Sequence, residues 1–185
     1  MGSSNVSQPG PSLAERARAV ELLLLDVDGV LTDGRIVYTD NGVELKAFHV
    51  RDGSGLKLWH LAGKKSAIIS GRTSKAVEVR AAELGVGLVL QGMSDKRAGF
   101  QKVLTQTGLR AEQVCCVGDD VPDVPLLRQC GLAVAVADAC PEARAAAQYV
   151  TRATGGHGAV RETIELILRC QDHWQKLVDQ LVGGP

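Results

Sequence analysis

Short apolar runs alternate with helix-like segments along this chain, and this alternation limits the possible folds more than any other feature. The first run, residues 22–27, is apolar except for Asp26 near its end. Such a run is typical of a strand that is buried on both faces of a sheet. Similar runs, which predict further strands, occupy residues 65–69, 87–90, 113–117 and 132–135.

Helix-like segments separate most of these predicted strands. Gly85 and Gly108 directly follow two of the segments and predict left-handed helix ends. Strands joined by helices of this length imply βαβ units, so we predict a three-layer α/β fold with a parallel central sheet covered on both faces. The expected helices are 55–62, 74–84, 95–107, 123–130 and 143–147, with one or two more between 159 and 182.

A different pattern interrupts the alternation between residues 35 and 48. Two β-rich runs, 35–38 and 43–48, flank the sequence Thr39-Asp40-Asn41-Gly42. An Asn-Gly pair between such runs is a strong signal for a tight turn, because both residues accept the left-handed backbone that the turn needs. We therefore expect a β-hairpin that protrudes from the sheet.

Length and composition fit a single domain. The chain has 185 residues, of which 45% are hydrophobic, enough for one sizeable core. Its first dozen residues, MGSSNVSQPGPS, are small, polar and rich in proline and glycine, and they lack the basic-then-apolar order of a signal peptide. We expect a disordered tail over residues 1–18 and one domain over residues 19–185.

Charge and cysteine content argue against several classes of function. Lys plus Arg and Asp plus Glu number 21 each, so the formal net charge is zero. Binding to nucleic acids or to anionic membranes normally needs a basic surplus, so we expect neither partner. The apolar run 22–25 is far too short to span a bilayer. The five cysteines show no zinc-ligand spacing, which favours reduced thiols in a cytoplasmic protein.

Polar residues follow the predicted strands at the edge where ligands bind in parallel sheets. Taken singly, each has a structural explanation: Asp28 fits a turn, Ser70 a helix N-cap and Lys96 an ordinary exposed lysine. Together they predict a site, because the carboxyl ends of parallel strands meet at one edge. The residues expected to gather there are Asp26, Asp28, Ser70, Gly71, Arg72, Lys96, Asp119, Asp120 and Asp123.

These residue types fit the hydrolysis of a phosphate monoester. A carboxylate can attack phosphorus and form an aspartyl-phosphate, and we assign this role to Asp26. Asp28 would protonate the leaving oxygen and later activate water. Ser70, the Gly71 backbone N–H and Lys96 would bind the phosphate oxygens.

Carboxylate and phosphate repel each other, so a divalent cation must lie between them. Hard oxygen ligands suit Mg²⁺. We expect Asp26, the backbone carbonyl of Asp28 and Asp119 to hold the ion, with Asp120 and Asp123 as further acidic residues of the metal site.

In the order of its motifs the chain resembles the haloacid dehalogenase-like phosphatases. Asp26-Val27-Asp28-Gly29-Val30 resembles the first motif of that family, D-x-D-x-[TV], and Ser70 resembles the Ser/Thr of the second. Lys96 resembles the lysine of the third motif, and residues 118–123 resemble the fourth, acidic motif. One Asp-x-Asp is weak evidence, but four motifs in order form a specific signal. The resemblance covers nearly the whole chain after residue 20.

Longer segments resemble one branch of that family, the 3-deoxy-manno-octulosonate 8-phosphate and nonulosonate 9-phosphate phosphatases. This branch also includes the phosphatase-like domain of some CMP-sialic acid synthetases. The resemblance implies a Rossmann-like domain without a cap. It also implies a homotetramer in which the 35–48 hairpins form a central β-barrel and help close a neighbour's active site. The matching segments are 26–34, 48–53, 118–120, 134–138 and 155–162.

The same resemblance implies an eight- or nine-carbon 2-keto-3-deoxy sugar acid phosphate as substrate. In the octulosonate enzymes the Gly-Gly-x-Gly segment usually carries arginine where this chain has His157. Histidine predicts a weaker or pH-dependent cation beside the sugar carboxylate. The residues expected to contact substrate or phosphate are Val27, Thr32, Arg51, Gly71, Arg72 and His157.

Two alternatives remain open at the level of sequence. The same chemistry could serve a different small phosphate ester, which a substrate panel would distinguish. The chain could also be a non-catalytic tetramerising module associated with a CMP-sugar synthetase. Retention of every catalytic residue type argues against the second alternative.

Overall fold

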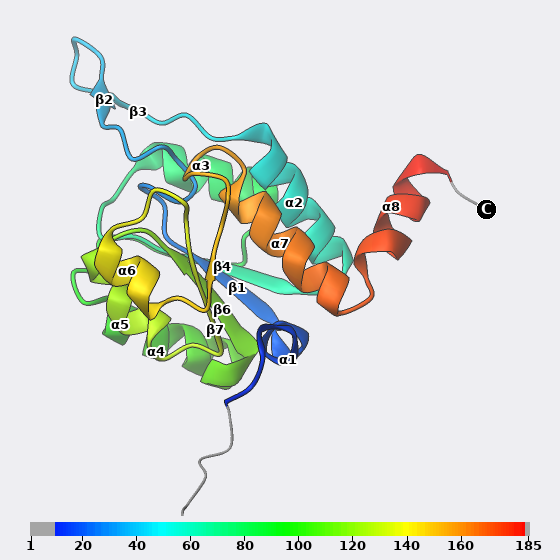
Figure 1. Cartoon of the computed structure of the whole chain (residues 1–185). Coiled ribbons are helices and arrows are strands. Elements are labelled where there is room, and N and C mark those ends of the chain that lie inside the picture. The colour runs from blue at the N-terminus through cyan, green and yellow to red at the C-terminus, as the bar shows by residue number, and fades with distance from the viewer. Residues whose placement is uncertain (1–9, 184–185) are drawn as a thin grey trace, which may run out of the picture.

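A six-stranded parallel sheet forms the centre of the computed structural model, which describes residues 10–183 (Figure 1). Leu25 lies opposite Ile68 on one side and Val117 on the other, so the residues that follow these three strands emerge at one edge. The strand order is β5-β4-β1-β6-β7-β8. The strands are β1 (Leu22–Leu25), β4 (Lys65–Ile69), β5 (Leu88–Leu90), β6 (Val114–Gly118), β7 (Leu132–Ala135) and β8 (Tyr149–Val150).

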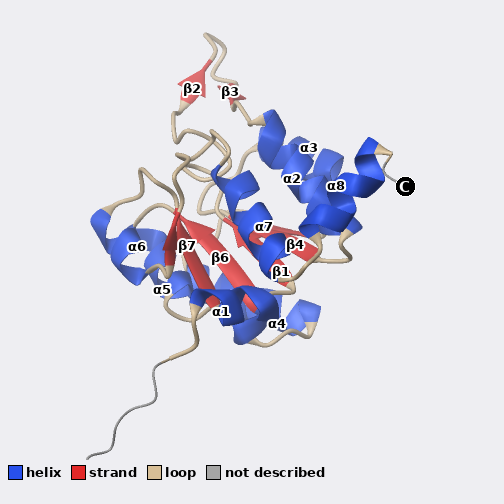
Figure 2. Ribbon diagram, turned by 45° about the vertical axis from the view of Figure 1, so that its right-hand side comes forward, coloured by secondary structure: helices blue, strands red, loops and turns tan. Residues whose placement is uncertain are grey.

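Helices cover both faces of the sheet, as the α/β prediction requires (Figure 2). One layer contains α2 (Val50–Leu61), α3 (Lys75–Leu84) and α7 (Ala159–Cys170), with α1 (Leu13–Ala19) packed against α7. The other contains α4 (Lys96–Thr107), α5 (Val124–Leu127) and α6 (Pro141–Ala146). The remaining helical segments are α8 (Trp174–Val182) and the 3₁₀ turns η1 (Ala111–Gln113) and η2 (Val121–Asp123).

The core lies between the sheet and its two helical layers. All four leucines of β1 are at most 1% exposed, which confirms that this run is buried on both faces. Trp59 of α2 and Phe100 of α4 are fully buried on opposite faces of the sheet. No helix within residues 10–183 has the length and apolar character needed to cross a membrane.

Several predicted boundaries are wrong, among them the helix expected over 123–130, which ends at Leu127, and two have a clear local reason. Helix α1 occupies residues 13–19, all but the last of which lie in the expected tail, because Ser12 and Glu15 form a reciprocal capping box that starts the helix. The first nine residues of that tail lie outside the described part of the chain. Helix α2 begins at Val50 rather than near Gly55, since the two glycines in its first turns disguise the helical pattern.

The predicted hairpin is confirmed, and it protrudes from the body of the molecule (Figure 1). Strands β2 (Val37–Tyr38) and β3 (Glu44–Leu45) pair antiparallel, with Tyr38 opposite Glu44 and Val37 opposite Leu45. Because side chains alternate along a strand, Tyr38 and Glu44 share one face and Val37 and Leu45 share the other. The hairpin therefore has a polar face and an apolar face.

The loop of residues 155–158 supports the loop that follows β1. Gly156 donates its backbone N–H to Val30, at 2.9 Å, and Gly155 donates to Asp138, also at 2.9 Å. A Cβ atom on Gly155 would stand 1.7 Å from the carbonyl oxygen of Gly29. The two backbones can approach this closely only because residue 155 has no side chain.

Gly155→Ala should therefore lower the free energy of unfolding by about 2–3 kcal/mol, because the added methyl overlaps backbone that cannot move without disturbing the loop after β1. Urea unfolding of both proteins measures the difference. Gly87→Ala is the matched control, since its Cβ would meet nothing within 4 Å, and it should change stability by less than about 0.5 kcal/mol. Equal effects of the two substitutions would contradict the packing argument.

Candidate active site

A cavity of about 260 Å³ opens at the carboxyl edge of the sheet. It lies where β1, β4 and β6 end, as the strand-end argument predicted. Larger hollows of about 390 and 570 Å³ elsewhere on the described surface lack its concentration of carboxylates around a buried lysine. The residues lining it are Asp26, Asp28, Ser70, Gly71, Arg72, Lys96, Asp119, Asp120, Pro122 and Asp123.

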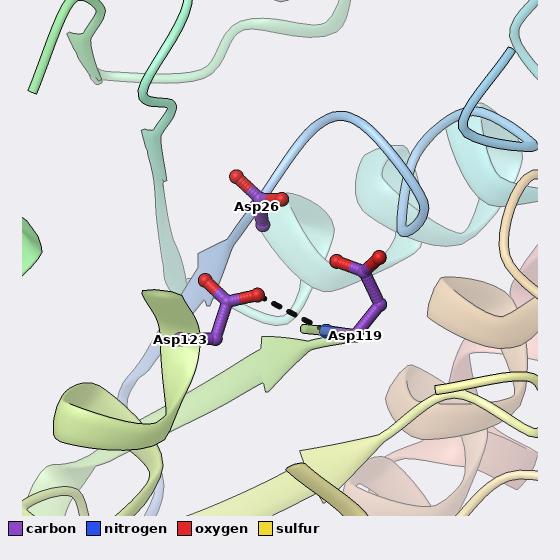
Figure 3. A group of neighbouring side chains, drawn as sticks. All are labelled: Asp26, Asp119 and Asp123. Carbon is purple, nitrogen blue, oxygen red and sulfur yellow. Dashed lines mark hydrogen bonds between the residues drawn. The ribbon is translucent and has the colours of Figure 1, made fainter. Parts of the chain in front are cut away.

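Three carboxylates converge in this cavity (Figure 3). Asp26, Asp119 and Asp123 each offer an oxygen, and these oxygens all lie within 4.8 Å of one another. Asp123 is fixed by the loop itself, because it accepts the backbone N–H groups of Asp119 at 3.1 Å and Asp120 at 3.4 Å. Gly29 makes room for the group: a Cβ there would stand 2.0 Å from Asp119 Oδ2.

Lys96 is the buried cation of the cluster. Its Nζ lies 2.8 Å from Asp26 Oδ1 and 2.5 Å from Asp123 Oδ1, and its side chain is 7% exposed. Asp95 caps helix α4 by accepting the backbone N–H groups of Arg97 and Ala98, which fixes Lys96 in the first turn. The N-cap therefore decides where the ammonium enters the cavity.

Burial and mutual repulsion shift the ionisation of this cluster. Burial and the nearby Asp123 together raise the pKa of Asp26 to about 6, against the opposing charge of Lys96. Burial also raises the pKa of Asp119 to about 8, reinforced by Asp26 and Asp123. Lys96 is buried too, but the two carboxylates beside it raise its pKa. One ammonium thus offsets only part of the negative charge.

The donor set fits a hard divalent cation. Asp119 Oδ1 is buried and has no hydrogen-bond partner among the described residues, so this acceptor lacks a donor or a cation. Carboxylate oxygens are the ligands that Mg²⁺ prefers. Asp26 and Asp119 fit the predicted metal site, and Asp123 joins them in the cluster. The carboxylates of Asp28 and Asp120 line the cavity but lie outside the three-carboxylate group.

The polar face of the hairpin closes one side of the cavity, which sequence reasoning did not anticipate. Lys46 bonds to Asp28, and Glu44 accepts a hydrogen bond from Arg72 at 2.6 Å. The Tyr38 hydroxyl lies 3.4 Å from the same guanidinium. The alternation of Glu44 and Lys46 along the strand was a signal that these two side chains share a face. Ser70 is nearly buried, and its Oγ accepts the Arg72 backbone N–H at 3.2 Å.

Four other predicted substrate contacts lie outside the cavity lining. The Val27 side chain is fully buried in the core. The Thr32 hydroxyl donates to the Val27 carbonyl and accepts the backbone N–H groups of Gly29 and Gly34, so it braces the loop after β1. Arg51 is exposed on α2, and His157 is exposed with its Nδ1 2.8 Å from the Gly155 carbonyl.

Comparison with known proteins gives consistent matches. The profile of the haloacid dehalogenase-like hydrolase family matches residues 64–163. The 3-deoxy-D-manno-octulosonate 8-phosphate phosphatase of Escherichia coli (strain K12) is 46% identical over 173 residues, covering 92% of each chain. The crystal structure of the phosphatase of that name from Yersinia pestis is 46% identical, with a TM-score of 0.86 and 88% of each chain covered.

A further solved structure matches with bound ligands. The 3-deoxy-D-manno-octulosonate 8-phosphate phosphatase of Moraxella catarrhalis, in complex with a magnesium ion, a phosphate ion and a KDO molecule, is 39% identical to this chain. The TM-score is 0.89, and the match covers 91% of this chain and 97% of that one.

Mg²⁺ should stabilise the protein more at pH 8 than at pH 6. The pKa values of Asp26 and Asp119 are raised above the ordinary 3.8, so the folded metal-free protein retains protons that the unfolded chain releases. Its stability should fall as pH rises from 3.8 toward about 8, and a cation that replaces those protons should restore it. Thermal melting with EDTA or Mg²⁺ at the two pH values measures this.

Asp119→Asn should remove most of the pH-dependent part of the response to Mg²⁺, because of the two carboxylates it removes the one with the more strongly raised pKa. Asp179→Asn is the matched control and should respond like the wild type, because Asp179 is exposed on α8. An identical response to Mg²⁺ in Asp119→Asn and the wild type would place the stabilising ion elsewhere.

Proposed function

The chain belongs to the haloacid dehalogenase-like hydrolases, and we propose that it is the Mg²⁺-dependent phosphatase of 3-deoxy-D-manno-octulosonate 8-phosphate. One observation carries the proposal: the Asp26 carboxylate stands beside Lys96 in a group of three carboxylates at the end of the central strand. High identity over almost the whole chain to phosphatases named for this sugar acid supports the substrate.

In the proposed reaction Asp26 attacks phosphorus, and the bond between phosphorus and the sugar oxygen breaks. Asp28 protonates the departing sugar oxygen. Asp28 then takes a proton from water, which hydrolyses the aspartyl-phosphate and restores Asp26. Lys96, Ser70 and the Gly71 backbone hold the phosphoryl oxygens. When bound by Asp26 and Asp119, Mg²⁺ supplies the positive charge that lets a carboxylate approach a phosphate.

Arg72 is the cation placed to meet the carboxylate of the sugar acid. It lines the cavity from the residues after β4, and its side chain is 42% exposed. A guanidinium suits a carboxylate, because the two groups can form paired hydrogen bonds. A nine-carbon sugar acid would present the same group, so nonulosonate 9-phosphate is the substrate to compare.

We also propose that the protein is a homotetramer assembled through the 35–48 hairpin. Exposed apolar residues on the hairpin support this, because a monomer gains nothing by leaving them in water. Val37 and Leu45 form a cross-strand pair on the face opposite the polar network at the cavity. The residues that are 46–58% exposed are Ile36, Val37, Tyr38, Val43 and Leu45. The five free cysteines support a cytoplasmic location, where thiols stay reduced.

Purified protein with Mg²⁺ should release phosphate from octulosonate 8-phosphate, and Asp26→Asn should lower kcat by at least about 1,000-fold because the amide is not a nucleophile. The assay is inorganic phosphate release with Mg²⁺ or EDTA. Asp179→Asn is again the control and should keep wild-type activity. Nonulosonate 9-phosphate and glucose 6-phosphate extend the panel, and the ratios of kcat/KM identify the substrate. Activity on another ester but on neither sugar acid phosphate would support the phosphatase chemistry and contradict the proposed substrate.

The double variant Val37→Glu with Leu45→Glu should dissociate the tetramer, because it places charges on the exposed apolar face that assembly would bury. Size-exclusion chromatography with light scattering measures the mass. Leu61→Glu is the control, since Leu61 is 66% exposed at the end of α2 and outside the hairpin. A wild-type protein with the mass of a monomer would contradict the tetramer proposal.

A further inference from the structure

Lys46 is a buried lysine that no motif of the sequence singles out. It follows strand β3 on the hairpin, and its side chain is only 1% exposed. Its ammonium bonds to Oδ1 of Asp28 and lies 3.5 Å from Glu44 Oε1. An ammonium is rarely buried without a fixed partner, because removing its charge from water is unfavourable unless an opposite charge lies beside it. Asp28 is the partner that holds it in place.

A second set of contacts holds the hairpin against the same carboxylate. Arg72 donates to Glu44 at 2.6 Å, and its Nε lies 3.6 Å from Asp28 Oδ2. Glu44 and Lys46 lie two residues apart and therefore project to the same side of the strand. The Asp28 carboxyl thus has Lys46 on one oxygen and Arg72 near the other. The hairpin end and the residues after β4 enclose this carboxyl from two directions.

The two oxygens of Asp28 are not equivalent in this arrangement. Oδ1 is engaged by Lys46, whereas the 3.6 Å between Oδ2 and Arg72 Nε is longer than a hydrogen bond. An ammonium cannot accept a proton, so a proton carried by this carboxyl resides on Oδ2. Oδ2 is therefore the oxygen that remains available to a leaving group.

We propose that Lys46 is a positioning residue for acid catalysis: it holds Oδ1 of Asp28 so that Oδ2 presents its proton to the departing sugar oxygen. The inference rests on the proposed phosphatase activity. A general acid works only when its proton lies within hydrogen-bond reach of the leaving atom, and a free aspartate side chain can rotate away from it. Lys46 removes that freedom, so its loss slows the step in which the sugar oxygen departs.

Leaving groups that need no proton distinguish this role from a structural one. The test compares kcat/KM for octulosonate 8-phosphate, whose alkoxide must be protonated, with 4-nitrophenyl phosphate, whose phenolate leaves without help. For each ester, kcat/KM reports the steps up to cleavage of the ester bond and is insensitive to hydrolysis of the aspartyl-phosphate. Lys46→Met should lower kcat/KM by at least about 30-fold for the sugar phosphate and by less than about 3-fold for the aryl phosphate.

Lys64→Met is the matched control. Lys64 is also a nearly buried lysine in an ion pair, with Nζ 2.8 Å from Glu21, but it lies at the amino end of the sheet. Lys64→Met should leave kcat/KM unchanged for both esters. Lys46→Gln is the second variant. If thermal melting shows that Lys46→Met does not fold, the kcat/KM values of Lys46→Gln for the two esters test the role of Lys46. Equal losses on both esters, or no loss on either, would overturn the assignment.

Asp26→Asn separates failure of this inference from failure of the proposed function. If Asp26→Asn keeps activity on both esters, the phosphatase assignment itself is wrong. If Asp26→Asn is inactive and Lys46→Met loses the two activities equally, the phosphatase stands and the role of Lys46 falls. A selective loss on the sugar phosphate supports both.

Discussion

The excess of negative charge at the carboxyl edge of the sheet is the constraint on which the site depends. Asp26 and Asp123 share the buried ammonium of Lys96, and Asp119 lies beside them with its buried Oδ1 unpartnered among the described residues. Burial strengthens both the attraction and the repulsion, so the cluster is incomplete without a further positive charge. This deficit accounts for the raised pKa values of Asp26 and Asp119 and for the fit to a divalent cation.

The hairpin connects this chemistry to the outer surface of the molecule. Its polar face holds Asp28 and Arg72 through Lys46 and Glu44, and its apolar face is exposed. Assembly through the apolar face would therefore fix the polar face as well, since both belong to the same short pair of strands. Oligomerisation and the orientation of the acid would then depend on one element.

Most of the fold could be predicted because local signals agreed with the tertiary structure. The four leucines of β1 require burial on both faces, and Gly85 and Gly108 end α3 and α4 in left-handed conformations as expected. Helix α1 was missed because a capping box overrode a polar composition. The two-residue strand β8 was missed because so short an element has no periodicity to detect.

The sequence by itself determined the order of the elements and the residue types at the strand ends, because strand and helix periodicities and parallel-sheet topology are local rules. It placed Asp26, Lys96 and Asp119 in one cavity. The sequence also named Asp120 and Asp123 for the metal site, but only the tertiary structure decided that Asp123, rather than Asp120, joins Asp26 and Asp119 in the carboxylate group. It also decided that Thr32 braces a loop. It alone brought Lys46 to Asp28, because a contact between segments 18 residues apart depends on how the hairpin folds back over the sheet edge.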